Sequence, residues 1–274
     1  MDYIQRYLLE ELENMNPTKK FQNEVDVNIQ RLGSDKDLQA LSRIWVREVS
    51  PYKWAYNFSW LGRPAIQFPN DAWAMQELIW QVKPDLIIET GIAHGGSLIF
   101  SASMLALLDM TDAIEAGETF DPRESKRKVI GIDIDIREHN KAAITAHPMA
   151  SRIEMIQGSS ISPETVATVR AIAEKYACVM VCLDSNHTHA HVLGELEAYA
   201  PLTSIGSYCV VFDTLIEDMP SSLSADRPWD VGNNPKTAVW EYLRSNPAFE
   251  IDKGIQDKLL ITVAPDGYLK RVAA

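Results

Sequence analysis

From residue 71 onward, short apolar runs alternate with longer amphipathic segments, and this alternation limits the possible folds more than any other feature of the chain. The apolar runs that predict strands are 85–89, 128–133, 152–156, 178–183 and 207–213. The helical patterns between them lie at about 95–108, 137–147, 162–175 and 189–200. Such alternation is typical of a mostly parallel sheet covered by helices on both faces. We therefore predict an α/β domain with a doubly wound, Rossmann-like sheet.

The C-terminal part adds two further strands to this prediction. Apolar runs at 248–251 and 258–263 flank a turn-like Asp252-Lys253-Gly254. Two such runs around a short turn predict an antiparallel pair. The sheet is then seven-stranded and mostly parallel, with a terminal antiparallel strand.

An N-terminal extension, residues 1–70, precedes the predicted sheet domain of residues 71–274. Large apolar side chains recur at the three- and four-residue intervals of a helix in this extension: Tyr7, Leu8, Leu12, Leu38, Leu41, Ile44 and Trp45. An aromatic stretch follows, with Tyr52, Trp54, Tyr56, Phe58 and Trp60. These aromatic residues either cover the core or form a dimer contact, or they form a wall of a substrate pocket. We expect a homo-oligomer, and a first domain helix that Asp71 caps and Pro84 ends.

Composition limits the kinds of partner. The formal net charge is −12 and no cluster of Lys and Arg stands out, which argues against nucleic acid. The N-terminus does not resemble a signal peptide, and we expect no membrane-spanning segment. Cys178, Cys182 and Cys209 lie in apolar runs, where free thiols behave as small hydrophobic side chains. We expect a cytoplasmic protein that acts on a small molecule.

A glycine-rich turn follows the first strand of the domain, with the sequence ETGIAHGGS over residues 89–97. Glycines at a strand-to-helix turn let a ligand approach the backbone, and a carboxylate at the strand tip can accept hydrogen bonds from it. The spacing differs from that of a dinucleotide fingerprint. We predict a nucleotide-like cofactor here, against the alternative of a plain turn. The candidate contacts are Glu89, Thr90, Gly91, His94, Gly95 and Ser97.

The second and third strands end in further candidate cofactor residues. Asp133 stands at the tip of the second strand, where an acid can bind ribose hydroxyls. Asp135 is an alternative, although either acid could instead cap the next helix. After the third strand, Ser159 and Ser160 could border an adenine.

The fourth and fifth strands end in carboxylates. Asp184 and Asp213 leave neighbouring strand tips, so they can share a divalent cation, with Asn186 or Thr214 adding a neutral oxygen.

Three histidines, His187, His189 and His191, follow the fourth strand. Their alternate spacing makes them diverge if a helix begins there, which argues against a shared transition metal. His187 is the candidate general base because it is nearest the strand tip, although a structural role is the alternative.

Together these motifs resemble one family, the cephalosporin hydroxylase-like and rhamnosyl O-methyltransferase-like branch of class I S-adenosylmethionine-dependent methyltransferases. The stretches DLIIETGIAHGGS, GIDIDIR, LDSNHTHAHV and VVFDT carry the resemblance, which spans roughly residues 55–265.

The resemblance implies a role for each motif. By the pattern of metal-dependent catechol-type enzymes, Glu89 and the turn to Ser97 would contact the methionine part of the cofactor. Asp133 would contact the ribose, and Ser159 or Ser160 the adenine. Asp184, Asp213 and Thr214 would surround Mg²⁺, and His187 would stand in place of the usual catalytic lysine. Where the cephalosporin-type branch has two consecutive acids, this chain has Phe212-Asp213, so one carboxylate is missing.

The expected function is transfer of a methyl group to a hydroxyl of a sugar or natural-product glycoside, with His187 and Asp184 as catalytic residues. Alternatives are a cofactor-binding subunit of another biosynthetic enzyme and a metal-dependent hydrolase. The segment 218–235, with Trp229, is either a substrate lid or a solvated loop.

Overall fold

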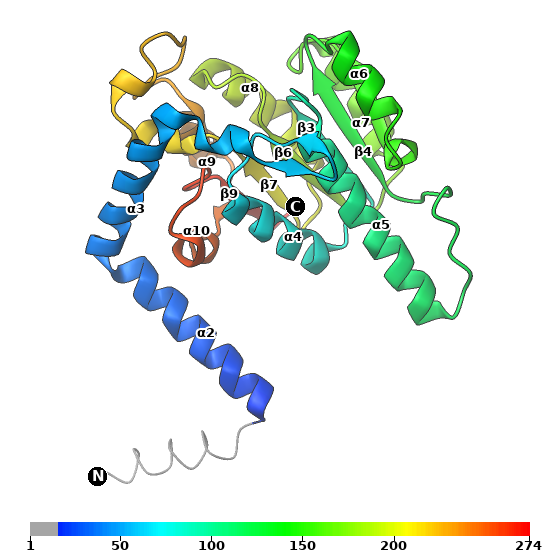
Figure 1. Cartoon of the computed structure of the whole chain (residues 1–274), viewed down its shortest axis with the longest axis horizontal. Coiled ribbons are helices and arrows are strands. Elements are labelled where there is room, and N and C mark those ends of the chain that lie inside the picture. The colour runs from blue at the N-terminus through cyan, green and yellow to red at the C-terminus, as the bar shows by residue number, and fades with distance from the viewer. Residues whose placement is uncertain (1–15) are drawn as a thin grey trace.

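A computed structural model describes residues 16–274, and its centre is a seven-stranded sheet with the order β5-β4-β3-β6-β7-β9-β8 (Figure 1). The strands are β3 (Leu86–Thr90), β4 (Lys128–Asp133), β5 (Ile153–Gln157), β6 (Val179–Leu183), β7 (Tyr208–Val211), β8 (Phe249–Ile251) and β9 (Tyr268–Arg271). The first five are parallel to one another, and β9 runs antiparallel to both β7 and β8. The predicted mostly parallel, seven-stranded sheet is confirmed.

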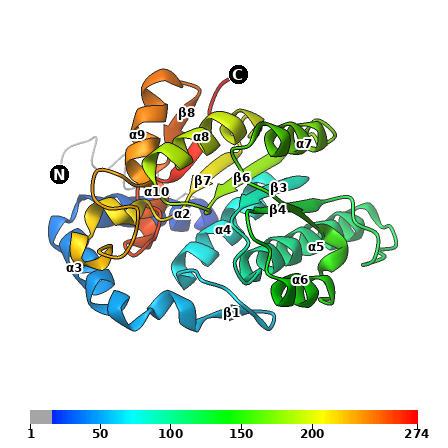
Figure 2. The same cartoon turned by 90° about the horizontal axis from the view of Figure 1, so that it is seen from above.

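Helices cover both faces of this sheet (Figure 2). One face packs on α4 (Pro69–Val82), α5 (Gly96–Ala116), α6 (Glu138–Thr145) and α10 (Lys253–Leu259). The other face packs on α7 (Pro163–Ala173), α8 (His189–Tyr199) and α9 (Pro235–Ser245). Successive residues of each central strand alternate between the two cores, so β3 and β6 are buried throughout. This burial on both faces explains why these strands read as continuous apolar runs.

The prediction of a strand at 258–263 is wrong. Asp252 caps α10, accepting a hydrogen bond from the Gly254 N–H at 3.2 Å, so the chain continues into a helix instead of a hairpin turn. Ile255 and Leu259, four residues apart, then pack on the core from one helical face. The last strand begins only at Tyr268.

Asp71 does not cap α4, because it is the third residue of that helix. It is fully buried, and its carboxylate accepts hydrogen bonds from the hydroxyl of Thr262, the N–H of Val263 at 3.0 Å and the hydroxyl of Tyr268 at 2.6 Å. Burial raises the pKa of Asp71 to about 6, although these donors oppose the shift. The carboxylate therefore ties α4 to the segment before β9.

The described part of the N-terminal extension forms α2 (Pro17–Ser34), α3 (Lys36–Val49) and a short hairpin of β1 (Ser59–Trp60) and β2 (Arg63–Pro64). Helices over the later part of the extension are thus confirmed, whereas Tyr7, Leu8 and Leu12 lie outside the described residues. Helix α2 points away from the sheet, and none of its residues is buried in the chain as described (Figure 1).

The hairpin, in contrast, packs on the start of α5. A side chain at Gly96 would place its Cβ 2.2 Å from the carbonyl oxygen of Pro64, so glycine is required for this approach. The Trp60 indole N–H donates to the Ser103 hydroxyl at 2.9 Å. The domain boundary at residue 70 remains a prediction, but part of the extension belongs to the packing around the first strand end.

One helix in the described chain, α5, is long and apolar enough to cross a membrane by length and composition alone. This criterion alone is weak evidence for a membrane span, because the core helix of a globular domain also meets it, and the expectation of no membrane-spanning segment stays a prediction. In the fold, α5 follows the glycine-rich turn and packs Leu98 and Leu105 against the sheet core.

Asp71→Ala should destabilise the fold more at low pH than at neutral pH. The folded pKa of Asp71, about 6, lies above the reference value of 3.8. The free energy by which the protonated Asp71 stabilises the fold is therefore fully present below pH 3.8 and declines as the pH rises toward 6. Each buried donor left unpaired costs about 1–3 kcal/mol. Urea unfolding at pH 4.5 and pH 7 measures the effect, with the exposed Asp226→Ala as control. An equal loss at both pH values would contradict this assignment.

Candidate functional site

The carboxyl ends of β3, β4, β6 and β7 meet at one edge of the sheet because these strands are parallel. Asp184 directly follows β6, and Asp213 follows β7 by two residues. Asp213 has φ of 56°, in the left-handed region that non-glycine residues seldom adopt. Strained backbone of this kind collects at functional sites, and here it places a second carboxylate beside Asp184.

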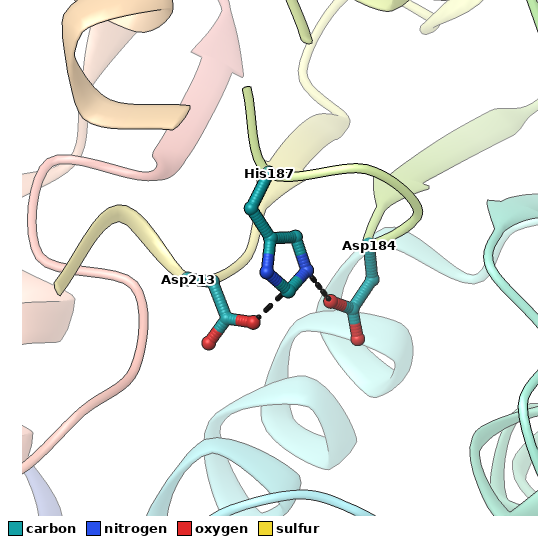
Figure 3. A group of neighbouring side chains, drawn as sticks. All are labelled: Asp184, His187 and Asp213. Atoms are coloured by element: carbon teal, nitrogen blue, oxygen red, sulfur yellow. Dashed lines mark ion pairs between the residues drawn. The ribbon is translucent and has the colours of Figure 1, made fainter. Parts of the chain in front are cut away.

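Asp184, His187 and Asp213 form a cluster whose potential ligand atoms all lie within 4.8 Å of one another (Figure 3). The Nε2 of His187 is 3.1 Å from Oδ2 of Asp213 and 3.6 Å from Oδ1 of Asp184. Burial raises the pKa of Asp184 to about 6, with the nearby Asp213 adding to the shift and the His187 hydrogen bond opposing it. The three side chains are 19% to 35% exposed, so solvent and small ligands can reach them.

The imidazole of His187 is strongly held in its cationic form. Burial lowers its pKa, but the carboxylates of Asp213 and Asp184 outweigh burial and raise it to about 9. The unperturbed value near 6.5 that sequence alone suggests is therefore wrong for this environment. A general base must be neutral. A base role for His187 thus requires another positive charge beside the carboxylates to offset their field.

The other two histidines point elsewhere, as their spacing predicts. His189 Nδ1 lies 2.8 Å from the Thr237 hydroxyl, and its Nε2 lies 3.1 Å from a Glu241 oxygen. His191 Nε2 lies 3.0 Å from the Ser160 hydroxyl. Within the described chain, His187 is the one histidine of the three that joins the two aspartates.

Thr214 is fully buried, and its hydroxyl donates to the carbonyl oxygen of Pro265 at 2.7 Å. It follows Asp213 directly, but its side chain is held by the segment before β9. The ligand role expected for Thr214 remains a prediction.

The glycine-rich turn is fixed by groups from three parts of the chain. The Asp133 carboxylate accepts from the backbone N–H groups of Ile92 at 2.9 Å and Ala93 at 3.3 Å. Arg63 of β2 donates to the carbonyl of His94 at 2.6 Å. Asn140 of α6 donates to the carbonyl of Ala93 at 2.9 Å. These hydrogen bonds tie the backbone of the turn to β2, β4 and α6.

Sequence reasoning missed Arg63 and Asn140. They lie 31 and 47 residues away from the carbonyl groups they hold, so no local pattern connects them. Asp135 does not cap α6 either, because the capping position belongs to Arg137, which makes no side-chain cap.

Two cavities open at this edge of the sheet. The smaller cavity, of about 220 Å³, lies between the ends of β3, β4, β5 and β6. Its walls include four of the predicted cofactor residues: Gly91, Asp133, Ser159 and Ser160. Ser185, Asn186, His191 and Trp229 close the other side.

A larger cavity of about 410 Å³ lies beside it, reaching Glu89, Ser97 and Asp184. The remaining walls are mainly apolar and include Phe58, Trp60, Phe68, Trp73, Phe100 and Phe212. Part of the aromatic stretch of the extension is thus a pocket wall, whereas Trp54 packs on the core. In the described structure, Thr90, His94 and Gly95 line neither cavity.

Glu89 is a buried acid at the inner end of the larger cavity. Burial raises its pKa to about 8, with Asp184 adding to the shift, while the hydroxyl of Ser97 donates to it and opposes the shift. A cationic partner beside Glu89 would lower this pKa and stabilise the carboxylate form.

The segment 218–235 lies over the strand ends and is anchored at its far end. The Gly232 N–H donates to Glu217 at 2.8 Å, and Asn233 accepts from the His189 N–H at 3.0 Å. The Trp229 ring lies 4.7 Å from the ring of His187, and Trp229 also lines the smaller cavity. Trp229 thus contacts the cluster instead of standing free in solvent.

A family model described as rhamnosyl O-methyltransferase/CmcI matches residues 52–272. The chain belongs to this family. Membership confirms the resemblance found in the sequence and identifies an S-adenosylmethionine-dependent O-methyltransferase.

Individual members of the rhamnosyl O-methyltransferase/CmcI family are distant. A rhamnosyl O-methyltransferase of Mycobacterium leprae (strain TN) is 28% identical over 228 residues, covering 80% of this chain and 88% of that protein. A CmcI structure with Mg and S-adenosylmethionine is 19% identical with a TM-score of 0.51, covering 80% of this chain and 78% of that one. The apo structure of CalS11, a TDP-rhamnose 3'-O-methyltransferase, is 16% identical with a TM-score of 0.50, covering 95% and 97%. These structures agree with the fold.

Gly91→Ala should damage the site through one close contact. Gly91 has φ of +89°, and a Cβ there would lie 2.0 Å from the carbonyl oxygen of Asp184. Gly117→Ala is the matched control, because Gly117 also has positive φ but open space around it. We expect binding of S-adenosylhomocysteine, measured by calorimetry, to weaken at least about tenfold in Gly91→Ala, which is about 1.4 kcal/mol. Equal effects of both variants would mean that backbone strain alone is responsible.

Proposed function

We propose that the protein transfers the methyl group of S-adenosylmethionine to a hydroxyl of a sugar or natural-product glycoside, with a divalent cation at Asp184 and Asp213. The observation that carries this proposal is the position of Asp184. It lines the larger cavity, while its neighbour Ser185 lines the smaller one. The chain thus passes from the wall of one cavity to the wall of the other at the tip of β6, beside the carboxylate cluster, and we place the donor and the acceptor on the two sides of this point.

The adenosine part of the cofactor fits the smaller cavity in this proposal. Asp133 lines this cavity and is the candidate for the ribose, and Ser159 and Ser160 line it as candidates for the adenine. Gly91, Glu89 and Ser97 would hold the methionine part of the cofactor. Its cationic amino group would lower the pKa of the buried Glu89 carboxyl, whose proton would pass to solvent on binding.

The chemistry of the donor set supports a divalent cation. Two carboxylates provide oxygen ligands of the kind Mg²⁺ prefers, and the missing second acid at Phe212 leaves positions for water or for the acceptor oxygen. A cation there supplies charge that binds the acceptor hydroxyl and lowers its pKa. Asp184 and Asp213 hold the site, and His187 accepts the proton from the acceptor hydroxyl.

The larger cavity supports an acceptor with an apolar face. Aromatic side chains such as Trp60 and Trp73 suit the C–H face of a sugar ring or an apolar group attached to it, and Phe212 closes the inner wall. Relatives named as rhamnosyl O-methyltransferases support the sugar as the substrate class. A metal-dependent hydrolase with several histidine ligands is disfavoured, because His189 and His191 are bonded away from the cluster.

Chelation should abolish methyl transfer by the isolated protein, and Mg²⁺ should restore it. Asp213→Asn should raise the Mg²⁺ concentration needed for half-maximal activity, because it removes one ligand charge while keeping the shape. Asp135→Asn, an exposed acid at the same sheet edge, is the control. Transfer of labelled methyl to rhamnosides, other glycosides and phenols measures activity. Full activity after exhaustive chelation would exclude the cation, and no transfer to any acceptor would favour an accessory subunit.

His187→Ala should lower turnover roughly 100- to 10,000-fold, the usual contribution of a positioned base. Cofactor affinity should change little, because His187 does not line the smaller cavity among the described residues. His189→Ala is the control, since that side chain is bonded to Thr237 and Glu241. Near-normal turnover in His187→Ala would leave positioning and the cation as the source of catalysis.

A further inference from the structure

Glu195 is a buried acid that takes no part in the proposed methyl transfer and contacts a residue lining the smaller cavity, Ser185. Glu195 of α8 is fully buried, and its Oε1 accepts from the hydroxyl of Ser185 at 2.6 Å. Its Oε2 is buried and has no hydrogen-bond partner among the described residues. An acid kept at this depth with so few partners costs stability. The titratable side chain beside this acid is that of His191.

His191 lies one helical turn before Glu195 and is fixed along one edge of its ring. Its Nε2 is 3.5 Å from Oε1 of Glu195 and 3.0 Å from the hydroxyl of Ser160. Ser160 is itself held, because its carbonyl oxygen accepts from the Tyr199 hydroxyl at 2.5 Å. The imidazole is thus oriented by groups from α8 and from the loop after β5.

The acid also determines which ring nitrogen of His191 carries the proton. A carboxylate oxygen close to Nε2 repels a lone pair there and favours the tautomer with N–H at Nε2. Nδ1 is then an acceptor. Nδ1 makes no hydrogen bond within residues 16–274 and is not among their buried unpartnered atoms, so it is open. His191 lines the smaller cavity, which puts its ring within reach of a ligand there.

We propose that His191, oriented by Glu195 and Ser160, accepts a hydrogen bond from the exocyclic amino group of adenine and makes the site selective for adenine over hypoxanthine. This inference rests on the proposed position of the adenosine in the smaller cavity. His191 is a binding residue for the base, and Glu195 is a positioning residue that acts through His191.

Selectivity follows from the hydrogen bonds that each base can make. Adenine presents two N–H groups at its six-position, which match an acceptor on the imidazole. Hypoxanthine presents an oxygen there, so two acceptors face each other and both are left unpaired. A site built to pair with a given polar group rejects an analogue lacking it far more strongly than it rejects a change in size.

The test compares two ligands that differ only at this atom, S-adenosylhomocysteine and S-inosylhomocysteine, by titration calorimetry. We expect the wild-type protein to prefer the adenine ligand by at least about tenfold. In His191→Phe, which keeps the ring but removes its nitrogens, the preference should fall to within about threefold through weaker binding of the adenine ligand. Glu195→Gln, which keeps shape and burial, should reduce the preference to an intermediate value. His189→Phe, on the same helix but facing α9, should keep the wild-type preference.

The affinities of the wild-type protein and the variants for the two ligands distinguish base recognition by His191 from a structural role. An unchanged preference in both His191→Phe and Glu195→Gln overturns the proposal. An equal loss of affinity for both ligands also overturns it, because it shows a structural role for His191. Failure of the wild-type protein to bind either ligand overturns the proposed function itself, which is a different outcome from binding without selectivity.

Discussion

The close approach of the ends of β3 and β6 is the contact on which the rest of the site depends. The Asp184 N–H donates to the carbonyl of Thr90 at 3.0 Å, which extends the sheet pairing by one residue beyond β6. Gly91 permits this approach, because any side chain there would strike the Asp184 carbonyl. Once the two strand ends are held together, the glycine-rich turn lies beside the first carboxylate, and both cavities open at the same place.

The electrostatics of the site follow from gathering acids at that edge. Glu89, Asp184 and Asp213 leave neighbouring strands, and burial raises the pKa of the first two. His187 offsets part of this negative charge and becomes strongly basic as a result. Such a site favours positive ligands, and both proposed occupants, the sulfonium cofactor and a divalent cation, bring positive charge. The cationic histidine and the cation then compete for the same two carboxylates, which links metal binding to the availability of the base.

The N-terminal extension takes part in the site instead of lying outside it. Arg63 holds the glycine-rich turn, and Phe58 and Trp60 form part of the larger cavity. The pocket wall therefore combines residues from both sides of the boundary predicted at 70. Asp71 joins α4, whose side chains Ala72, Trp73 and Met75 line the larger cavity, to the last strand through Tyr268.

The sequence by itself determined the sheet, the strand ends and the kinds of group placed there. Each central strand is buried on both faces and is therefore a continuous apolar run in the sequence. The turn glycines and the acids at the strand ends directly follow these runs, so a local pattern is enough to find these residues. The terminal strand was misplaced because residues 258–263 are apolar for another reason: Leu259 at the end of α10, and Ile261 and Val263 after it, pack on the core without forming a strand.

The tertiary structure alone decided which of these groups meet. Periodicity does not record that Arg63 reaches the carbonyl of His94, or that Asp213 turns back to within 3.1 Å of His187. The sequence could not show that His187 is held as a cation. From the residue type alone one expects the usual pKa of histidine, and only the folded chain brings two carboxylates to the imidazole ring. Hydrogen bonds and electrostatic fields depend on distance in space, and distance between segments far apart in sequence is set by packing alone.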